Sequence, residues 1–164
     1  MPDDHTPSED QTRRKVETRI WLQILALEST VFNRLNGALS TQFGLSVAKF
    51  EFLAQVARYP EGISLGRISA NLKVTSGNVS GLVRRLLVDG LITKTMSDED
   101  RRSFIVHFTP TGKALFDKAN LLHAQTLAQC FAAASSSELD SSLEALRALT
   151  ARIQPAERLE KQNA

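Results

Sequence analysis

Cysteine is almost absent from this sequence, since Cys130 is the only one among 164 residues. A single thiol cannot close a disulfide within the chain, and it excludes the CxxC motifs and Cys/His clusters that hold a metal ion. Only three histidines occur, and they are scattered: His5, His107 and His123. We therefore predict no metal site and no cofactor, and we expect a reducing compartment.

Long apolar runs are absent as well. No segment is apolar over the roughly 20 residues that a membrane-spanning helix needs. The N-terminus, Met1 to Gln11, is polar and acidic with no apolar stretch behind it, so it has the composition of neither a signal peptide nor a membrane anchor. These absences predict a cytoplasmic protein with no membrane partner.

The sequence also lacks the residue groupings that catalysis needs. We find no nucleophile with a neighbouring base, no paired carboxylates suited to a cleft and no set of metal ligands. Asp98, Glu99 and Asp100 cluster, but they fall in a charged turn where no pocket would perturb them. We predict that the protein is not an enzyme and has no catalytic residues.

Net charge is low, at a formal +2, which excludes the strongly basic proteins that bind nucleic acid without discrimination. The positive charge is nevertheless uneven, because the stretch from Ser64 to Met96 has five basic residues and one acid, a net +4. The acid is Asp89, and the basic residues are Arg67, Lys73, Arg84, Arg85 and Lys94. A localised basic surface is what contact with DNA requires.

Two helical patterns occupy this stretch, separated by the short polar connection from Lys73 to Thr75. The first has the apolar spacing of a short amphipathic helix, at Leu65, Ile68 and Leu72. The second stripe ends at Gly90 and comprises Val79, Leu82, Val83, Leu86 and Leu87. The spacing therefore predicts a helix-turn-helix.

A β-hairpin is predicted after the second helix. Its strand-like runs are Leu91 to Met96 and Ser103 to Thr109, joined by the charged turn from Ser97 to Arg102. Helix, turn, helix and hairpin in this order are the plan of a winged helix-turn-helix. The arginines at the hairpin tip, Arg101 and Arg102, have no packing role there, which favours a contact with DNA.

The outer face of the second helix has the residue types that a recognition helix needs. Short side chains let its backbone approach the duplex, hydrogen-bonding groups reach base edges, and cations bind phosphates. The residues with these properties are Thr75, Ser76, Asn78, Ser80, Gly81, Arg84 and Arg85. The alternative is a polar face that is merely solvated, as on many amphipathic helices. The basic hairpin tip favours DNA binding over that alternative.

Leucine-rich helices flank the unit on both sides. We predict a long helix over residues 13–45, two helices over 110–155, and tails without fixed structure at 1–12 and 156–164. The DNA-binding lobe covers residues 46–109. Because a lone winged helix does not need these helices, we expect them to form a homodimer; the alternative is a monomeric core. The predicted fold is mainly α with a small β-hairpin wing, flanked by N- and C-terminal dimerisation helices.

Four capping signals mark the helix starts, each a serine or threonine whose side chain can accept a backbone hydrogen bond: Ser46, Ser64, Thr109 and Ser135. Pro110 follows Thr109 at the first helical position, and Glu138 completes a capping box with Ser135. We expect Pro155 to end the last helix.

Four segments carry a more specific resemblance: Leu72–Leu86 (LKVTSGNVSGLVRRL), Asp89–Ile92 (DGLI), Asp100–Ser103 (DRRS) and Phe108–Gly112 (FTPTG). In this order and at this spacing, the chain resembles the MarR family of transcriptional regulators over nearly its whole length. The resemblance implies an obligate dimer, a recognition helix in the major groove of double-stranded DNA and a wing arginine in the minor groove.

The resemblance also implies roles for single residues. The recognition-helix residues are Thr75, Ser76, Asn78, Ser80 and Arg84. Arg85 lies nearer the DNA backbone or the wing. In the wing, Asp100 matches the acid that braces the turn, Arg101 matches the minor-groove residue, and Arg102 matches a partner of Asp100 or of phosphate. Glu99 departs from the family pattern, because many members have another arginine there.

Members of this family typically repress an adjacent operon until a small molecule binds between the dimer helices and the DNA-binding lobe. Here the resemblance implies a repressor of a pseudo-palindromic operator that is released by a small aromatic or phenolic acid, or by its thioester. Arg19 or Arg34 could hold the carboxylate through two parallel hydrogen bonds. The candidate effector-binding residues are Arg19, Trp21, Arg34, Phe50, Phe52 and Tyr59.

Two alternatives stay open at this point. The arginines among these residues could equally be solvated helix residues, and the aromatic residues could belong to the core. For the whole protein, the alternative function is a winged-helix dimer that acts through protein partners without sequence-specific DNA binding. That alternative predicts no salt-dependent DNA affinity, and it leaves the small-residue face of the second helix unexplained.

Overall fold

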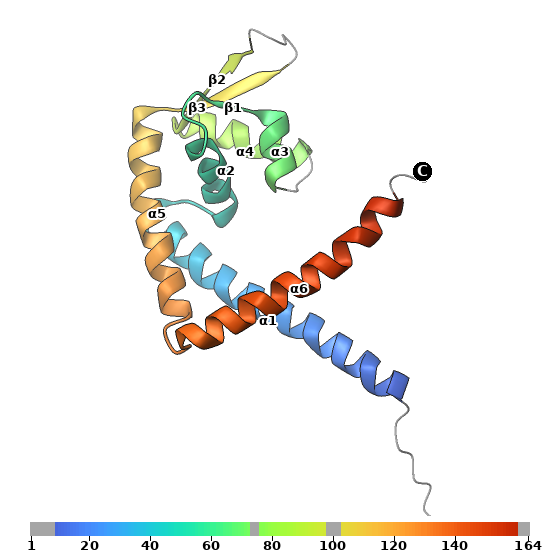
Figure 1. Ribbon diagram of the computed structural model, residues 1–164. Coiled ribbons are helices and arrows are strands. Elements are labelled where there is room, and N and C mark those ends of the chain that lie inside the picture. Colours follow the sequence, from blue (N-terminus) through green and yellow to red (C-terminus); the bar gives the residue numbers. More distant parts are fainter. Residues whose placement is uncertain (1–8, 73–75, 98–102, 161–164) are drawn as a thin grey trace, which may run out of the picture. The chain divides into compact units, whose positions relative to one another are not determined.

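The computed structural model describes residues 9–72, 76–97 and 103–160, with only the helical backbone described for residues 76–78 and 154–160. Within these residues the elements in chain order (Figure 1) are α1 (Glu9–Phe43), α2 (Val47–Ala57), β1 (Ile63–Ser64), α3 (Leu65–Leu72), α4 (Ser76–Val88), β2 (Ile92–Met96), β3 (Phe104–Phe108), α5 (Pro110–Cys130) and α6 (Ser136–Glu160). Helices predominate and the strands form one small sheet, which confirms the predicted fold class. The chain divides into two compact units, Met1–Leu127 and Ala128–Ala164.

The sheet has the strand order β1-β3-β2, and both strand pairs are antiparallel. The β2–β3 hairpin is the predicted wing, and its register runs from Ile92 opposite Phe108 to Met96 opposite Phe104. β1 was not predicted, because two residues are too few to show the alternation of a strand. Ile63 and Ser64 of this strand pair with Val106 and Ile105, so β1 connects the start of α3 to the middle of β3.

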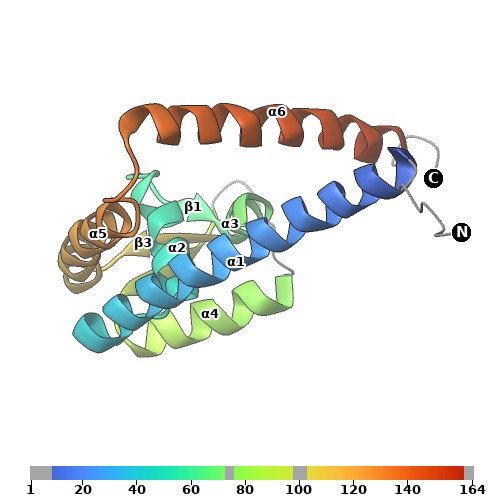
Figure 2. The ribbon, with the colours of Figure 1, turned by 90° about the horizontal axis from the view of Figure 1, so that it is seen from below.

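α2 is the centre of the predicted DNA-binding lobe. It contacts α1, α3, α4 and β3, and these elements surround it in Figure 2. Phe52 and Leu53 of α2 are fully buried. Ile68 of α3, Leu86 of α4 and Val106 of β3 are buried in the same hydrophobic cluster. The helix-turn-helix and the wing therefore share one core, which fixes their relative positions.

This core extends beyond residues 46–109, the bounds predicted for the lobe. Leu35 and Leu39 of α1 are buried in the same cluster, as are Phe116 and Ala119 of α5. The C-terminal part of α1 and the first half of α5 are thus structural parts of the lobe. A displacement of either helix would therefore also displace the elements that pack with α4 in this core.

The start of α5 is fastened to the turn between α4 and β2. The Thr109 hydroxyl accepts the Gly112 N–H at 2.9 Å and donates to the carbonyl oxygen of Gly90 at 2.7 Å. A Cβ atom on Gly112 would lie 1.8 Å from the backbone oxygen of Leu91. The predicted cap at Thr109 is confirmed, and glycine at position 112 is required by the close approach of α5 to Leu91.

The other predicted caps are confirmed as well. Ser46 accepts a backbone N–H of α2 at 3.3 Å, and Ser64 accepts the N–H of Arg67 at 3.3 Å. Ser135 and Glu138 form a reciprocal capping box, with distances of 2.8 and 3.3 Å. The hydrogen bonds from Ser135 lower the pKa of the Glu138 carboxyl. These caps determine where α2, α3 and α6 begin.

Two helix ends differ from the sequence predictions. α1 begins at Glu9, so residues 9–12, predicted to lack fixed structure, are helical. Two acids lie in this first turn, where negative charge is stabilised by the helix dipole. α6 continues to Glu160 although Pro155 was expected to end it, so the predicted tail 156–164 begins as helix. A proline removes one backbone donor, and here the helix continues past that loss.

Candidate nucleic-acid interface

α4 has one buried and one exposed face. Its buried residues pack into the core of the lobe: Val79, Leu82, Val83 and Leu86. Ser80, Arg84 and Arg85 lie on the exposed side. Next to Arg85 the helix surface is bare backbone at Gly81, and the guanidinium nitrogens of Arg85 lie 3.8 and 3.9 Å from the point that a Cβ of Gly81 would occupy. The helix therefore presents short groups and cations on the same side, as contact with a duplex requires.

The remaining predicted DNA-binding residues are described only in part. Ser76 and Asn78 belong to the first turn of α4, with their side chains outside the described residues. Thr75, Arg101 and Arg102 lie outside the described residues altogether. Ser80, Arg84 and Arg85 are thus the predicted contacts that the structure places on one exposed side of α4. The DNA-binding roles of all eight residues stay predictions.

Asp89, the single acid in the basic stretch, forms an ion pair with a lysine of α2. The Nζ atom of Lys49 lies 2.6 Å from a carboxylate oxygen of Asp89. This pair offsets the negative charge at the C-terminal end of α4, which would otherwise repel DNA phosphates. Sequence reasoning missed Lys49 because the lysine lies in the preceding helix, and no local pattern links it to Asp89.

Two further cations of the basic stretch lie over aromatic rings. The Nζ atom of Lys94 in β2 is 3.6 Å from the ring centroid of Phe104 in β3. The guanidinium carbon of Arg67 in α3 is 4.6 Å from the ring centroid of Tyr59. Contacts of this kind orient a cation without neutralising it. In the sequence, both residues contribute only to the count of positive charge, and no local pattern predicts where their side chains lie.

Phe50 and Phe52, which were predicted as effector-binding residues, are buried in the core of the lobe. Phe52 is 0% and Phe50 4% exposed. The Phe50 ring stacks on His123 and Phe116, with centroid separations of 4.6 and 5.6 Å. The physical reason is the central position of α2, which is covered on several sides and places its aromatic residues in the core. The ring of Tyr59 is partly covered by the Arg67 guanidinium.

The other predicted effector-binding residues lie on α1 and are exposed. Trp21 is 58% exposed, and Arg19 and Arg34 are solvent-accessible. Arg19 lines a surface hollow of about 410 Å³, whose described lining residues are Arg14, Lys15, Thr18 and Arg19. The six predicted residues thus divide between a solvent-exposed helix and the lobe, and their role in binding an effector stays a prediction.

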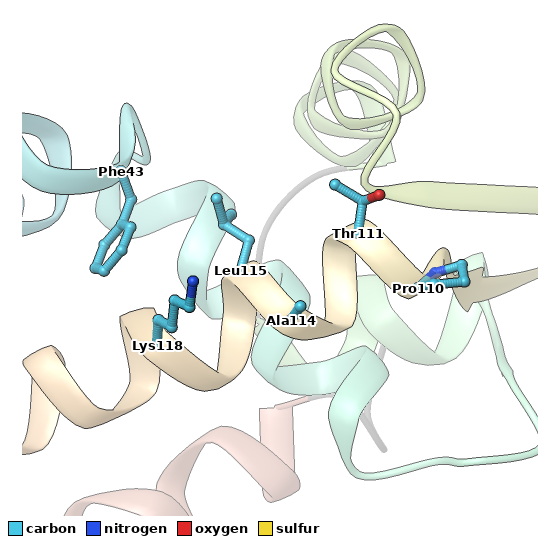
Figure 3. A pocket seen from close by; sticks show the side chains of 6 residues that line it. All are labelled: Phe43, Pro110, Thr111, Ala114, Leu115 and Lys118. Carbon is cyan, nitrogen blue, oxygen red and sulfur yellow. The ribbon is translucent and has the colours of Figure 1, made fainter.

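A hollow of about 550 Å³ lies between the end of α1 and the first half of α5. Figure 3 shows Phe43, Leu115 and Lys118 extending toward the same space from these two helices. Its lining residues are Phe43, Pro110, Thr111, Ala114, Leu115 and Lys118. Apolar walls with one cation suit an acid that has an apolar body. Sequence reasoning missed this site, although positions 111, 115 and 118 have the spacing of one helix face.

Other chemistry is sparse in the part of the chain that the structure describes. Among the residues it covers, no helix is long and apolar enough to cross a membrane. No group of three or more described His, Cys, Asp or Glu side chains could hold a metal ion. Cys130 is a half-buried free thiol near the end of α5.

The lobe with its wing and exposed basic helix is that of a winged-helix DNA-binding protein. Residues 43–103 match a sequence model described as MarR family. A MarR family transcriptional regulator from Silicibacter pomeroyi has 41% sequence identity and a TM-score of 0.76, and the match covers 86% of this chain and 97% of that one. An uncharacterised HTH-type transcriptional regulator of Bacillus subtilis, YkoM, is 28% identical over 109 residues, 66% of this chain and 70% of the relative. The chain belongs to the MarR family of transcriptional regulators.

Two more distant structures have the same fold. A mutant MarR from E. coli, solved in complex with operator DNA, has 19% identity and a TM-score of 0.74 over 80% of this chain and 93% of that one. CouR from Rhodococcus jostii RHA1, solved bound to p-coumaroyl-CoA, has 21% identity and a TM-score of 0.68 over 79% and 90%. At these identities the likeness concerns the fold alone.

Proposed function

We propose that the protein is a cytoplasmic, homodimeric repressor that binds a pseudo-palindromic operator and is released by a small aromatic or phenolic acid, or by its thioester. The observation that carries the proposal is the exposed face of α4, where Ser80, Arg84 and Arg85 lie opposite a fully packed side. A helix held so rigidly can enter a major groove without reordering the lobe. No catalytic role belongs to this proposal.

In the proposed complex the N-terminal half of α4 lies in the major groove. The recognition residues are Thr75, Ser76, Asn78, Ser80 and Arg84. Arg85 binds the DNA backbone near the wing, Arg101 enters the minor groove, and Arg102 binds phosphate or Asp100. Support comes from the MarR of E. coli, which has this fold and was solved with operator DNA.

The proposed dimer is supported by apolar side chains that one chain leaves exposed. On α1 these are Val16, Ile20, Trp21, Leu22, Ile24, Leu25, Leu27 and Phe32. On α6 they are Leu139, Leu143, Leu146, Leu149 and Ile153. Exposed apolar stripes of this length are uncommon on soluble monomers, because covering them lowers the free energy. A second copy of the chain covers them in our proposal, and the two lobes then read two half-sites about one helical turn apart.

We assign the effector to the hollow between Phe43 and Lys118. Its volume is about 550 Å³, within the range of small-molecule sites. The ammonium group of Lys118 pairs with the acid, while Phe43 and Leu115 contact the apolar body. CouR, which has this fold, was solved bound to the thioester p-coumaroyl-CoA, and this supports the chemical class of the ligand.

Release of the operator follows from the contacts that connect this hollow to the wing. Thr111 lines the hollow, and one turn of α5 connects it to Thr109 and Gly112, which are fastened to Gly90 and Leu91 just before β2. A ligand that displaces α5 therefore displaces the base of the wing. The acid can change operator affinity only by the ratio of its own affinities for the free and DNA-bound conformations.

The test is a titration of the protein on the DNA upstream of its own gene and on random-sequence duplex, at two salt concentrations, with a panel of aromatic acids. We expect preferential, salt-dependent binding to the upstream DNA that one acid abolishes, and sedimentation as a dimer. Binding no tighter than to random duplex would reject the operator proposal in favour of a winged-helix dimer that acts through protein partners.

A further inference from the structure

Arg67 is held in place at both ends. Its backbone N–H donates to the Ser64 hydroxyl at 3.3 Å, and its guanidinium carbon lies 4.6 Å from the ring centroid of Tyr59. Tyr59 is itself anchored, since its side chain packs against the core and its carbonyl oxygen accepts the Gly62 N–H at 2.9 Å. An exposed arginine normally samples many rotamers, whereas this one has a defined position.

The ring of Tyr59 cannot occupy all the donors of this arginine. The guanidinium has five N–H groups in a planar fork, and a single ring lies 4.6 Å from its carbon atom. Arg67 forms no ion pair with another residue of the described chain. A planar, pre-oriented fork of donors matches two oxygens of a phosphate.

Arg67 also has the position that a backbone contact requires. α3 contacts α4, β1 and β3, and Figure 1 shows it beneath the β2–β3 hairpin. A recognition helix in the major groove and a wing in the adjacent minor groove lie on either side of one sugar-phosphate strand. The element that contacts both of them faces that strand.

We propose that Arg67 binds a phosphate of this DNA strand and that Tyr59 is its positioning residue. The inference rests on the proposed operator binding and adds a contact that carries no sequence information. It therefore strengthens binding to operator and to random DNA alike. It also gives the ring of Tyr59 a role that excludes effector binding on the face that Arg67 covers.

The test measures DNA affinity by fluorescence anisotropy between about 50 and 200 mM salt, the range over which phosphate contacts change affinity strongly. The proteins are wild type, Arg67→Ala, Arg67→Lys and the control Arg58→Ala. Arg58 is an exposed arginine next to Tyr59 in the sequence, so its removal costs the same charge in the same region. The probes are random-sequence duplex and the DNA upstream of the gene.

We expect Arg67→Ala to reduce the slope of log affinity against log salt by about 1 per subunit on both DNAs, with an affinity loss of about tenfold per subunit near 0.1 M salt. Arg67→Lys keeps the cation and recovers most of the slope. Arg58→Ala leaves the slope unchanged. An unchanged slope for Arg67→Ala, or an equal loss for Arg58→Ala, overturns the assignment, because the effect would then be absent or would be a general one of charge.

Tyr59→Leu separates positioning from charge. It keeps an apolar body against the core and leaves Arg67 in place, so we expect the wild-type salt slope with a severalfold lower affinity. Wild-type affinity for this variant would reject the positioning role of Tyr59. If the wild-type protein itself shows no salt-dependent binding to either duplex, the proposed function fails, and that result differs from failure of the Arg67 contact alone.

Discussion

Replacing Gly112 by alanine should destabilise the protein, although alanine is the better helix former. The new Cβ would lie 1.8 Å from the oxygen and 2.6 Å from the carbonyl carbon of Leu91. Cβ atoms essentially never approach within 3.0 Å, so α5 and the Leu91 backbone must separate by more than 1 Å. Overpacking of this kind costs about 1–3 kcal/mol, which exceeds the 0.5–1 kcal/mol or so gained from alanine in a helix. We expect a net loss of about 1–2 kcal/mol.

Gly37→Ala is the matched control, because a Cβ added at this position in the C-terminal part of α1 meets nothing within 4 Å. This variant should be more stable than wild type by about 0.5–1 kcal/mol. Urea denaturation at one fixed protein concentration, followed by circular dichroism, gives both free energies of unfolding. Since 1 kcal/mol corresponds to about 2–4 °C in Tm at this chain length, thermal scans resolve the difference. Equal stabilities for the two variants would refute the close approach of α5 to Leu91.

Three further variants test the hollow, the core and the pH dependence. Lys118→Met should abolish release by the acid while DNA binding persists. The control is Lys113→Met, which should still be released, because the ammonium of Lys113 pairs with a neighbouring carboxylate on α5. Equal release of both variants would show that the Lys118 cation is not part of the effector site. Leu86→Ala should lower the free energy of unfolding in urea by about 2–5 kcal/mol, because this side chain is 0% exposed. A loss smaller than that of Leu87→Ala, where the side chain is only partly covered, would contradict the packing of α4. Burial lowers the pKa of His123 in the folded protein. Its contribution to stability is therefore complete above about pH 6.5 and is lost as the pH falls through this lowered pKa, because the unfolded state then binds the extra proton. His123→Gln should therefore flatten the decrease in stability between about pH 7.5 and 5.5, and an unchanged pH profile would argue against this burial.

The fold could be predicted because its signals are local. The apolar spacing in α3 and α4, the hairpin with its charged turn and the caps at Ser46, Thr109 and Ser135 each depend on neighbouring residues. Side chains three to four residues apart meet on a helix whatever the rest of the chain does. Where the local signal was short or ambiguous the prediction failed, as at the two-residue strand β1 and at Pro155.

The effector site could not be predicted in the same way. Aromatic residues such as Phe50 and Phe52 occur in ligand-binding sites and in protein cores alike. Only the elements that pack around α2 place these two side chains in the core. The hollow with Lys118 depends on the end of α1 lying beside the first half of α5. The spacing of residues within either helix does not predict that the two helices lie side by side.

The sequence by itself determined that this chain forms a winged helix-turn-helix whose second helix has a basic face, because helix periodicity, turn residues and local charge suffice for those features. The tertiary structure decided which charges remain available to DNA. Lys49 pairs with Asp89 from another helix, and Tyr59 orients Arg67 across a turn. These contacts join side chains from different elements, and such pairs exist only once the core has fixed the elements against one another.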